Sequence, residues 1–435
     1  MKTNYALDHS VVTIHHDNEV VHLMIDLEAP EAPPLQRMPL DVVLVLDRSG
    51  SMGGSPLQSV IDATVSLLRR AHPQDRIGVV TFDSEASTVL ALGNHIPDMA
   101  TAKVRGIRSG GSTNLSGGWL KAFEMLSTST RPGALRRIVV LTDGLVNAGI
   151  TNSQQLGTLV GRGRENDITT SFVGFATEYD EALLEHLATQ GSGNNYYCEG
   201  PDQASAVFLA EFDGLSSVVA QNISIEIRPT DVVASAGVLN EYPLIALPSN
   251  GAQVEIGDAY GLECKRVVAG FHLRPLQKKG KVDIATLIIR WTSAIGNLEM
   301  HSVTVPVSII AGEPGMHDPG LDPRVRDEVF VLKVAKSRKE AHRLISRGFH
   351  DEAADFLEQA MISVREVPAL GKEVRELGEE IQRLRDGLWH KEDMKKLKAK
   401  EWEARRKRKA EYFGWFEESI PTEAEQGTSD NGEQK

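Results

Sequence analysis

Three polar loops contain the side chains that could do chemistry. Asp47, Ser49 and Ser51 occupy alternate positions directly after the apolar stretch DVVLVLD, in a turn that leads into a helical pattern. Thr113 lies in the loop GGSTN, and Asp143 follows another apolar stretch within Thr-Asp-Gly. Oxygen donors of this kind suit magnesium, calcium or manganese, whereas zinc or copper would call for histidine or cysteine. The loops therefore predict a site for a hard divalent cation, provided that the fold brings them together.

The elements around these loops indicate a parallel sheet. The apolar stretches DVVLVLD, RIGVVTF, RRIVVLTD and ITTSFVGFA alternate with helical patterns such as PLQSVIDATVSLLRRA and GGWLKAFEMLS. Strands that are apolar on both faces and alternate with helices are typical of a sheet covered on two sides. We predict an α/β domain with a doubly wound, mainly parallel sheet at residues 40–219. In such a sheet the ligand crevice lies at the carboxyl ends of the strands, where the three loops begin.

Taken together, the three loops resemble the metal-ion-dependent adhesion site of von Willebrand factor A (VWA) domains. Asp47, Ser49, Ser51, Thr113 and Asp143 match its five positions, and none is substituted. The resemblance implies that the two serines bind the metal directly and that the two aspartates act partly through water. It also implies that a carboxylate of a protein partner completes the coordination, because hydroxyl-rich ligation leaves the cation under-neutralised. Mg²⁺ is the expected ion, with Ca²⁺ or Mn²⁺ as alternatives.

Helix capping is the plainest alternative explanation of these residues. Ser and Asp after a strand often cap the next helix, and Ser55-Pro56 is a suitable cap and first-turn pair. Capping, however, does not require Thr113 and Asp143 as well.

Enzymatic alternatives lack their motifs. The sequence has no P-loop Lys-Ser/Thr, no Gly-x-Ser-x-Gly and no His-Glu-x-x-His. Ser49 also stands where an aspartyl phosphatase would place a second carboxylate. We therefore predict no catalytic residue and no organic cofactor.

The segments flanking the α/β domain are rich in strand patterns. Two β-branched runs within residues 10–27 surround the turn-forming Asp17-Asn18 and predict a hairpin, and residues 221–311 show short strands at the spacing of an antiparallel β-sandwich. Because a lone hairpin is too small to be stable, we expect residues 1–35 to supply the N-terminal strands of this sandwich. The VWA-like domain would then be inserted in the sandwich.

The C-terminal part has helical and then polar character. Residues 322–418 predict a helical region with a hairpin turn at Arg347-Gly348-Phe349, and residues 420–435 predict a disordered acidic tail. Basic runs at 395–400 and 405–409 are interpreted as a solvated helix face that could pair with the acidic tail, with binding to nucleic acid, an acidic membrane or an acidic partner as the alternative. Aromatic residues gather nearby and could dock this end on the body or on a partner; they are Trp402, Tyr412, Phe413, Trp415 and Phe416.

Composition limits the classes of function. The 435 residues carry a formal net charge of -13, which argues against a general nucleic-acid-binding role. Two cysteines without a C-x-x-C pair suggest a reducing compartment, and no apolar run approaches the roughly 20 residues that span a bilayer. We therefore expect a cytoplasmic protein without a membrane span.

Two hypotheses of function follow from the sequence. The first is a non-enzymatic, divalent-metal-dependent scaffold or adaptor that binds a protein partner through the adhesion site. The layout resembles bacterial cytoplasmic proteins with a VWA domain, some of which recruit substrates for other machines. The alternative is therefore a substrate-recruiting subunit of an AAA+ ATPase complex, whose ATPase would be a separate chain because no Walker motif is present.

Overall fold

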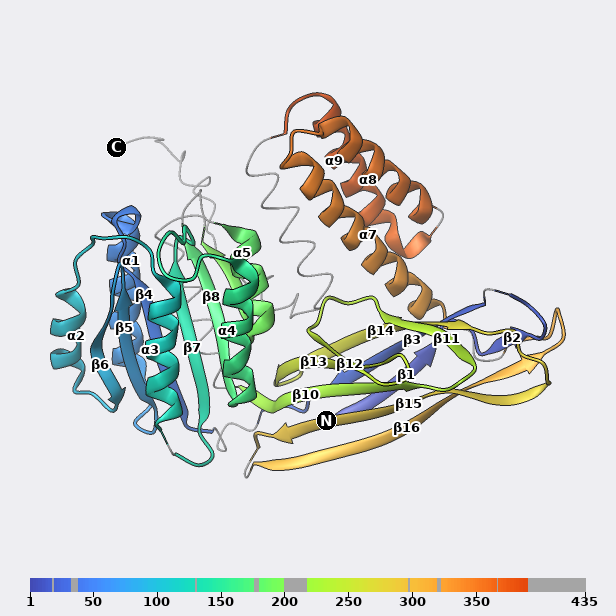
Figure 1. The fold of residues 1–435 in the computed structure, drawn as a ribbon, viewed down its shortest axis with the longest axis horizontal. Coiled ribbons are helices and arrows are strands. Elements are labelled where there is room, and N and C mark those ends of the chain that lie inside the picture. The colour runs from blue at the N-terminus through green and yellow to red at the C-terminus, as the bar shows by residue number, and fades with distance from the viewer. Residues whose placement is uncertain are drawn as a thin grey trace, which may run out of the picture.

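The computed structural model divides into an α/β body, a pair of packed β-sheets and a helical region (Figure 1). It describes residues 1–17, 19–32, 38–129, 131–175, 180–198, 217–295, 298–318, 322–365 and 367–389. Residues 390–435 lie outside the described part, so the predicted helix beyond residue 389 and the predicted acidic tail stay predictions.

The α/β body contains a six-stranded sheet of order β6-β5-β4-β7-β8-β9. The strands are β4 (Leu40–Asp47), β5 (Arg76–Phe82), β6 (Ala86–Gly93), β7 (Leu135–Thr142), β8 (Ile168–Phe175) and β9 (Ser192–Cys198). All neighbours pair in parallel except β6, which is antiparallel to β5. Every residue of β4 is buried, because helices cover both faces, and this accounts for its continuous apolar sequence.

Helices cover the two faces of this sheet unequally. They are α1 (Ser55–Arg70), α2 (Pro97–Arg105), α3 (Leu115–Ser127), α4 (Ser153–Glu165) and α5 (Glu181–Gln190), and the short 3-10 helix η1 (Gly50–Met52) joins β4 to α1. Val60 of α1 and Val104 of α2 share one core with one face of the sheet. Trp119 of α3, Leu156 of α4 and Leu184 of α5 share the core on the opposite face. The doubly wound fold class is therefore the observed one.

Two sheets, antiparallel except where β2 joins the second, pack against each other beside the α/β body. The first has the order β1-β3-β14-β11 and the second β12-β13-β10-β15-β16-β2. Their strands are β1 (Lys2–Leu7), β2 (Val11–Thr13), β3 (Val20–Glu28), β10 (Val218–Pro229), β11 (Val233–Val238), β12 (Leu244–Leu247), β13 (Gly251–Tyr260), β14 (Cys264–Leu273), β15 (Gly280–Ser293) and β16 (Glu299–Gly312). Leu23 and Ile25 of the first sheet share a core with Ile225 and Ile289 of the second. Since β1 to β3 precede the α/β body in the chain and β10 to β16 follow it, the body is inserted in a β-sandwich.

The predicted hairpin at residues 10–27 is wrong in its pairing. β3 forms its antiparallel pair with β1, whereas β2 joins the other sheet and lies parallel to the end of β16, with Val11 opposite Ile310. The two β-branched runs therefore belong to opposite sheets. A three-residue strand that pairs with a segment some 300 positions away leaves no local signal of its partner.

Buried polar contacts join the α/β body to the sandwich. Arg137 of β7 pairs with Asp258 of β13, and both side chains are nearly inaccessible to water. Asp258 also accepts a hydrogen bond of 3.4 Å from the Thr169 hydroxyl. Gly257 has φ +87°, and a Cβ there would lie 3.1 Å from the Ser192 backbone oxygen, so the two parts approach closely. Removing either partner of a buried ion pair is costly, which makes this junction part of the stable fold.

The helical region packs on the first sheet of the sandwich. It consists of α7 (Pro323–Ile345), α8 (His350–Val364), the 3-10 helix η2 (Pro368–Leu370) and α9 (Gly371–Arg385). Val325 and Val329 of α7 lie in one cluster with Met24 of β3 and Val268 of β14. The turn expected at Arg347-Gly348-Phe349 falls between α7 and α8, where Gly348 has φ +85°. In the described residues, no helix has both the length and the apolar character needed to cross a membrane.

Candidate metal centre

The five predicted ligands lie on loops at one edge of the α/β sheet. Asp47 is the last residue of β4, and Asp143 comes directly after β7. Ser49 directly precedes η1, and Ser51 lies within it. Because β4 and β7 are adjacent and parallel, their carboxyl ends meet at the same edge. Thr113 lies two residues before α3. We call this edge, with its three loops, the carboxyl edge.

Hydrogen bonds fix the loop after β4. The Ser49 amide donates to Asp47 Oδ1 at 2.8 Å, and the Ser49 and Ser51 hydroxyl oxygens lie 3.2 Å apart. The Thr142 hydroxyl donates to Asp47 Oδ2 at 2.6 Å and accepts from the Gly144 amide at 2.9 Å. Thr142 was not among the predicted site residues. Its signal in the sequence was a polar residue in an apolar strand, directly before Asp143.

Backbone contacts bring the Thr113 loop to the other two. The Gly50 amide donates to the Gly111 carbonyl at 3.1 Å, and this bond joins the Thr113 loop to the β4 loop. On the other side, the Thr113 amide donates to the Asn147 side-chain oxygen at 2.8 Å, and the Asn147 amide donates back to the Thr113 carbonyl at 3.3 Å. Asn147 is a second residue that the sequence analysis missed. The structure thus connects all three predicted loops.

Close packing against β5 holds the Thr113 loop in place. Gly111 has φ +77°, and a Cβ at this position would lie 3.0 Å from the Asp83 Cβ, so a larger residue would be strained there. Asp83 also pairs with the Arg48 guanidinium at 2.8 Å. The cation nearest in sequence to Asp47 is therefore held by another carboxylate.

Comparison with known proteins decides the family of the α/β body. The family model of the von Willebrand factor type A domain matches residues 41–210. These residues form a VWA domain.

Relatives in sequence include two bacterial proteins and a human one. The uncharacterized protein sll0103 of Synechocystis is 27% identical over 336 residues, which cover 75% of this chain and 78% of the relative. The uncharacterized protein YfbK of Escherichia coli is 25% identical over 62% of this chain and 46% of its own length. The human inter-alpha-trypsin inhibitor heavy chain H4 is 31% identical over 38% of this chain. The chain spans less than half of YfbK and 18% of the human protein.

Two solved structures share the fold over most of the chain. The von Willebrand factor type A protein from Catenulispora acidiphila superposes with a TM-score of 0.67 at 13% identity and covers 86% of this chain and 88% of its own. The ArnB paralog VWA2 from Sulfolobus acidocaldarius gives 0.63 at 17% identity and covers 93% and 98%. At such low identity the likeness concerns the fold alone. It extends well beyond the VWA domain.

The carboxyl edge of the VWA domain carries uncompensated negative charge. The side chains of Asp47 and Asp143 are 0% and 4% exposed. Burial raises the pKa of Asp47 to about 6, against the hydrogen bonds from Ser49 and Thr142, and the charge of Asp143 raises it further. Among the described residues, neither carboxylate forms a salt bridge. Two buried like charges without a cation disfavour each other, which makes the edge a place where a cation would bind well.

The donor chemistry of the VWA domain fits a hard divalent ion. Ser49 and Thr113 are each 1% exposed, and the Thr113 hydroxyl has no hydrogen-bond partner among the described residues. Because no hydrogen bond occupies this oxygen, it is available as a metal ligand. Within the same part of the chain, no group of three or more His, Cys, Asp and Glu side chains could hold a metal. These donors fit a metal site built mainly from hydroxyl oxygens, with few carboxylates.

Helix capping does not explain the serines. The N-cap of α1 is Gly54, without a side-chain hydrogen bond, so Ser55 is not the cap expected from the sequence. Ser49 precedes η1 but makes no capping bond either. By contrast, the Asn114 side chain caps α3 by accepting from the Gly117 amide at 3.0 Å. The hydroxyls of Ser49 and Ser51 thus do not cap a helix.

Proposed function

We propose that the chain is a non-enzymatic scaffold or adaptor that binds a protein partner through a divalent cation. The metal would be held by Asp47, Ser49, Ser51, Thr113 and Asp143. The observation that supports this best is the pair of buried carboxylates at the carboxyl edge, which lack a cationic partner among the described residues. When bound, the cation supplies a positive point to which a carboxylate oxygen of the partner attaches.

The contacts of each side chain suggest its task. Both carboxylate oxygens of Asp47 already accept hydrogen bonds, so this residue would act through its charge and by holding the β4 loop. Asp143 accepts one long bond, 3.4 Å from the Leu145 amide, which leaves it freer to face a metal or a metal-bound water. The neighbouring hydroxyls of Ser49 and Ser51 would bind as a pair.

Mg²⁺ is the ion that we propose. Mg²⁺ binds proteins through few side chains and keeps several waters, whereas Ca²⁺ takes six to eight oxygen ligands, often from several carboxylates. Two aspartates and three hydroxyls suit the first pattern better. Titrations with Mg²⁺, Ca²⁺ and Mn²⁺ in parallel will distinguish the three.

Calorimetric titration of the chelated full chain with MgCl₂ tests the proposal. We expect saturable binding in the wild type and at least a tenfold loss of affinity in Asp47→Ala and Thr113→Ala, because the first loses a negative charge beside the metal and the second a ligand hydroxyl. Asp98→Ala and Thr128→Ala change the same residue types at exposed positions of α2 and the end of α3, and should bind as the wild type. Thermal unfolding of each variant in chelator checks that the fold is kept.

Ligand linkage gives an independent measurement on the same samples. At a free Mg²⁺ concentration a hundred times the wild-type Kd, the free energy of unfolding should rise by about 2.7 kcal/mol in the wild type and by no more than about 1.4 kcal/mol in either site variant. Undiminished affinity in Asp47→Ala would remove the basis of the metal site. Partner capture that ignores chelator would remove the metal from the binding mechanism.

The alternative role, recruitment of substrates to a separate AAA+ ATPase, stays a prediction. No contact among the described residues favours it over a stand-alone scaffold. Purification of the tagged chain with and without chelator, followed by identification of any ATPase bound to it, would decide between the two.

A further inference from the structure

β16 lies along the border of the second sheet of the sandwich (Figure 1). On one side it pairs with β15 over nearly its whole length, from Glu299 to Ala311. On the other side β2 covers only residues 310–312. Among the described strands, none pairs with residues 299–309 on that side. We call the side of β16 that is left uncovered at residues 299–309 the β16 edge.

The even-numbered residues of β16 direct their backbone groups toward this edge. The Ile310 amide donates to the Ser10 carbonyl at 2.7 Å, and the Gly312 carbonyl accepts from the Ile14 amide at 3.0 Å. Because the backbone groups of successive strand residues alternate between the two sides, those of the even-numbered residues from 300 to 308 face the same way. In the described part of the chain, no other strand receives these groups.

Pro306 supports this assignment of the two sides. Proline has no N–H, so within sheets it occurs where the missing group would face away from the neighbouring strand. Pro306 is opposite Thr286 of β15 and has an even number, so its missing N–H faces the β16 edge. The irregularity of the β15–β16 pair inserts Ile284 into β15 and leaves the alternation of β16 unchanged.

Apart from Pro306, the β16 edge lacks the features that protect edge strands. Natural edge strands are commonly very short or carry charged side chains, lysine above all, which discourage pairing with another chain. Residues 300–309, MHSVTVPVSI, contain no Asp, Glu, Lys or Arg, although these types make up 25% of the chain. The stretch is also rich in the β-branched residues that favour strands. An uncharged edge of this length is suited to pairing with a further strand.

The position of the β16 edge defines a register for pairing with a second copy of itself. The edge runs from the start of β16 to the point where β2 begins to cover the strand, so its midpoint is Thr304. An antiparallel pair with a two-fold axis at Thr304 uses the whole edge and aligns Ser302 with Pro306 of the second copy. Because Pro306 has no N–H, one hydrogen bond is missing on each side of the axis, and the other outward groups are paired.

The side chains are compatible with this register. Thr304 lies opposite Thr304 of the second copy, and Thr–Thr pairs of this kind stabilise strand pairs through their hydroxyl groups. Met300, which is 78% exposed in the single chain, lies opposite Ser308. Val303 and Val305 pack against the core of the sandwich, so the pair continues the same apolar face across both copies. No like charges meet across the axis.

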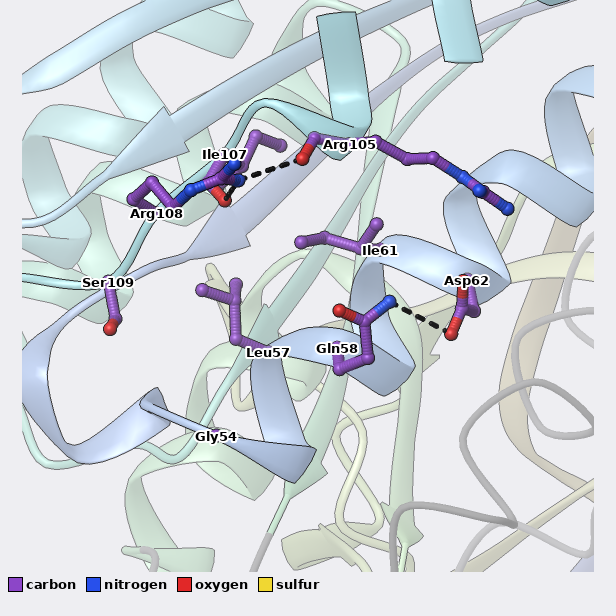
Figure 2. Close-up of a pocket in the computed structure, with 9 residues that line it drawn as sticks. All are labelled: Gly54, Leu57, Gln58, Ile61, Asp62, Arg105, Ile107, Arg108 and Ser109. Atoms are coloured by element: carbon purple, nitrogen blue, oxygen red, sulfur yellow. Dashed lines mark hydrogen bonds between the residues drawn. The ribbon is translucent and has the colours of Figure 1, made fainter. Parts of the chain in front are cut away.

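The pocket of the VWA domain differs from this edge (Figure 2). It lies between α1 and the segment after α2, and its volume is about 520 Å³. Its apolar lining residues, Leu57, Ile61 and Ile107, are buried in the domain core. The side-chain amide of Gln58 donates to Asp62 at 3.0 Å within it. The pocket therefore offers little apolar surface to a partner, whereas the β16 edge offers a row of backbone donors and acceptors.

We propose that the chain forms a dimer in which the β16 edges of two copies pair antiparallel about a two-fold axis at Thr304. The pair joins the second sheets of both copies into one sheet. Because both copies use the same edge, the contact closes on itself and does not propagate into a fibre. At the far edge of each sheet, the four-residue β12 lies between Pro243 and Pro248, which keeps that edge from extending the assembly.

Dimerisation has a consequence for partner binding that rests on the proposed function. Two copies joined at the sandwich carry two candidate metal centres, so a partner with two carboxylates meets the second centre at a raised local concentration. No residue of the β16 edge belongs to the metal loops, and the strand pair itself requires no metal. The dimer can therefore be tested in chelator, separately from the metal site.

Sedimentation equilibrium of the full chain in chelator measures the dimer. We expect a reversible monomer–dimer equilibrium in the wild type. Thr304→Lys places two ammonium groups opposite each other at the axis and should raise the Kd of the dimer about tenfold or more, because directly opposed like charges destabilise a strand pair. Thr88→Lys makes the same change at an exposed position of β6, the edge strand of the VWA sheet, and should leave the Kd unaltered.

Cysteine cross-linking tests the register. The background is the full chain with Cys198→Ser and Cys264→Ser. In this background Thr304→Cys lies opposite its own copy, at a Cα separation of about 5.5 Å that a disulfide can bridge. Ser302→Cys lies four residues from its own copy along the pair, about 14 Å away, which a disulfide cannot bridge. After mild oxidation we expect a covalent dimer from Thr304→Cys and none from Ser302→Cys on a non-reducing gel.

Several outcomes would overturn the proposal. They include a wild type that stays monomeric at every concentration and a dimer that Thr304→Lys and Thr88→Lys weaken equally or not at all. Equal cross-linking of Ser302→Cys and Thr304→Cys would mean that another contact joins the copies. Circular dichroism and the unfolding midpoint show whether each variant keeps the fold. A failed metal titration with an intact dimer would refute the metal site alone.

Discussion

Buried carboxylates have different partners at the two edges of the VWA sheet. At the amino ends of the strands, Asp41 pairs with Arg76, and Arg137 pairs with Asp258. At the carboxyl edge, Asp47 is equally buried but accepts hydrogen bonds from neutral hydroxyl and amide groups. The residue type and the burial are the same at both edges. What differs is the source of the positive charge, which the chain supplies at one edge and the solution would supply at the other.

The largest expected effect comes from removing one carboxylate at each edge. Asp258→Ala leaves the buried Arg137 without its partner and should lower the free energy of unfolding by about 3–5 kcal/mol. Asp143→Ala, measured in chelator, should change it by less than about 1 kcal/mol, because it also relieves repulsion with Asp47. Urea unfolding of both full-length variants measures the difference. Equal losses would mean that the two edges are not distinct.

The pH dependence of stability should identify Asp47 at the carboxyl edge. Its pKa of about 6 in the metal-free fold lies above the ordinary 3.8, so the folded protein holds a proton that the unfolded chain releases. This stabilisation is complete below about pH 4 and is lost as the pH rises through 6. Relative to Asp47→Asn, the chelated wild type should lose up to about 3 kcal/mol between pH 4 and 7. Parallel pH profiles of the two proteins would contradict the assignment.

A smaller effect is expected from the hydroxyl that supports Asp47. Thr142→Val keeps the shape of the side chain but removes the hydrogen bond to Oδ2, which favours the ionised carboxylate. Loss of such a bond is worth about 1.5 kcal/mol, so Mg²⁺ affinity should fall roughly tenfold. Thr81→Val, buried in the neighbouring strand β5, is the matched control and should bind normally. If both variants bind alike, Thr142 contributes packing and nothing more to the site.

Much of the fold could be predicted because its strands are strongly apolar. β4, β5, β7 and β8 were recognised, since a strand covered on both faces reads as a continuous apolar run. β6 and β9 were missed for the converse reason. β6 is an edge strand with many accessible residues, and the sequence of β9 is largely polar. Neither has the continuous apolar run that the neighbouring strands show.

The candidate site could be predicted in part for a similar reason. Its five residues follow a spaced pattern, and the order of strands places their loops at one edge. Thr142 and Asn147 were missed because their importance lies in hydrogen bonds across loops, which residue spacing does not encode. Whether the five residues bind a metal stays a prediction.

The insertion of the VWA domain also delays the pairing of β3 with β14 while the chain is being synthesised. Asp26 of β3 bonds to Arg266 of β14 across 240 positions of sequence. At about 5–20 residues per second, a ribosome takes on the order of 12 to 48 seconds to make the intervening chain. During that interval β3 has β1 on one side and an open edge on the other, and the VWA domain completes its six strands at Cys198, before β14 is made. A nascent chain halted before Cys264 would therefore expose an unpaired strand, a form suited to capture by chaperones or to aggregation.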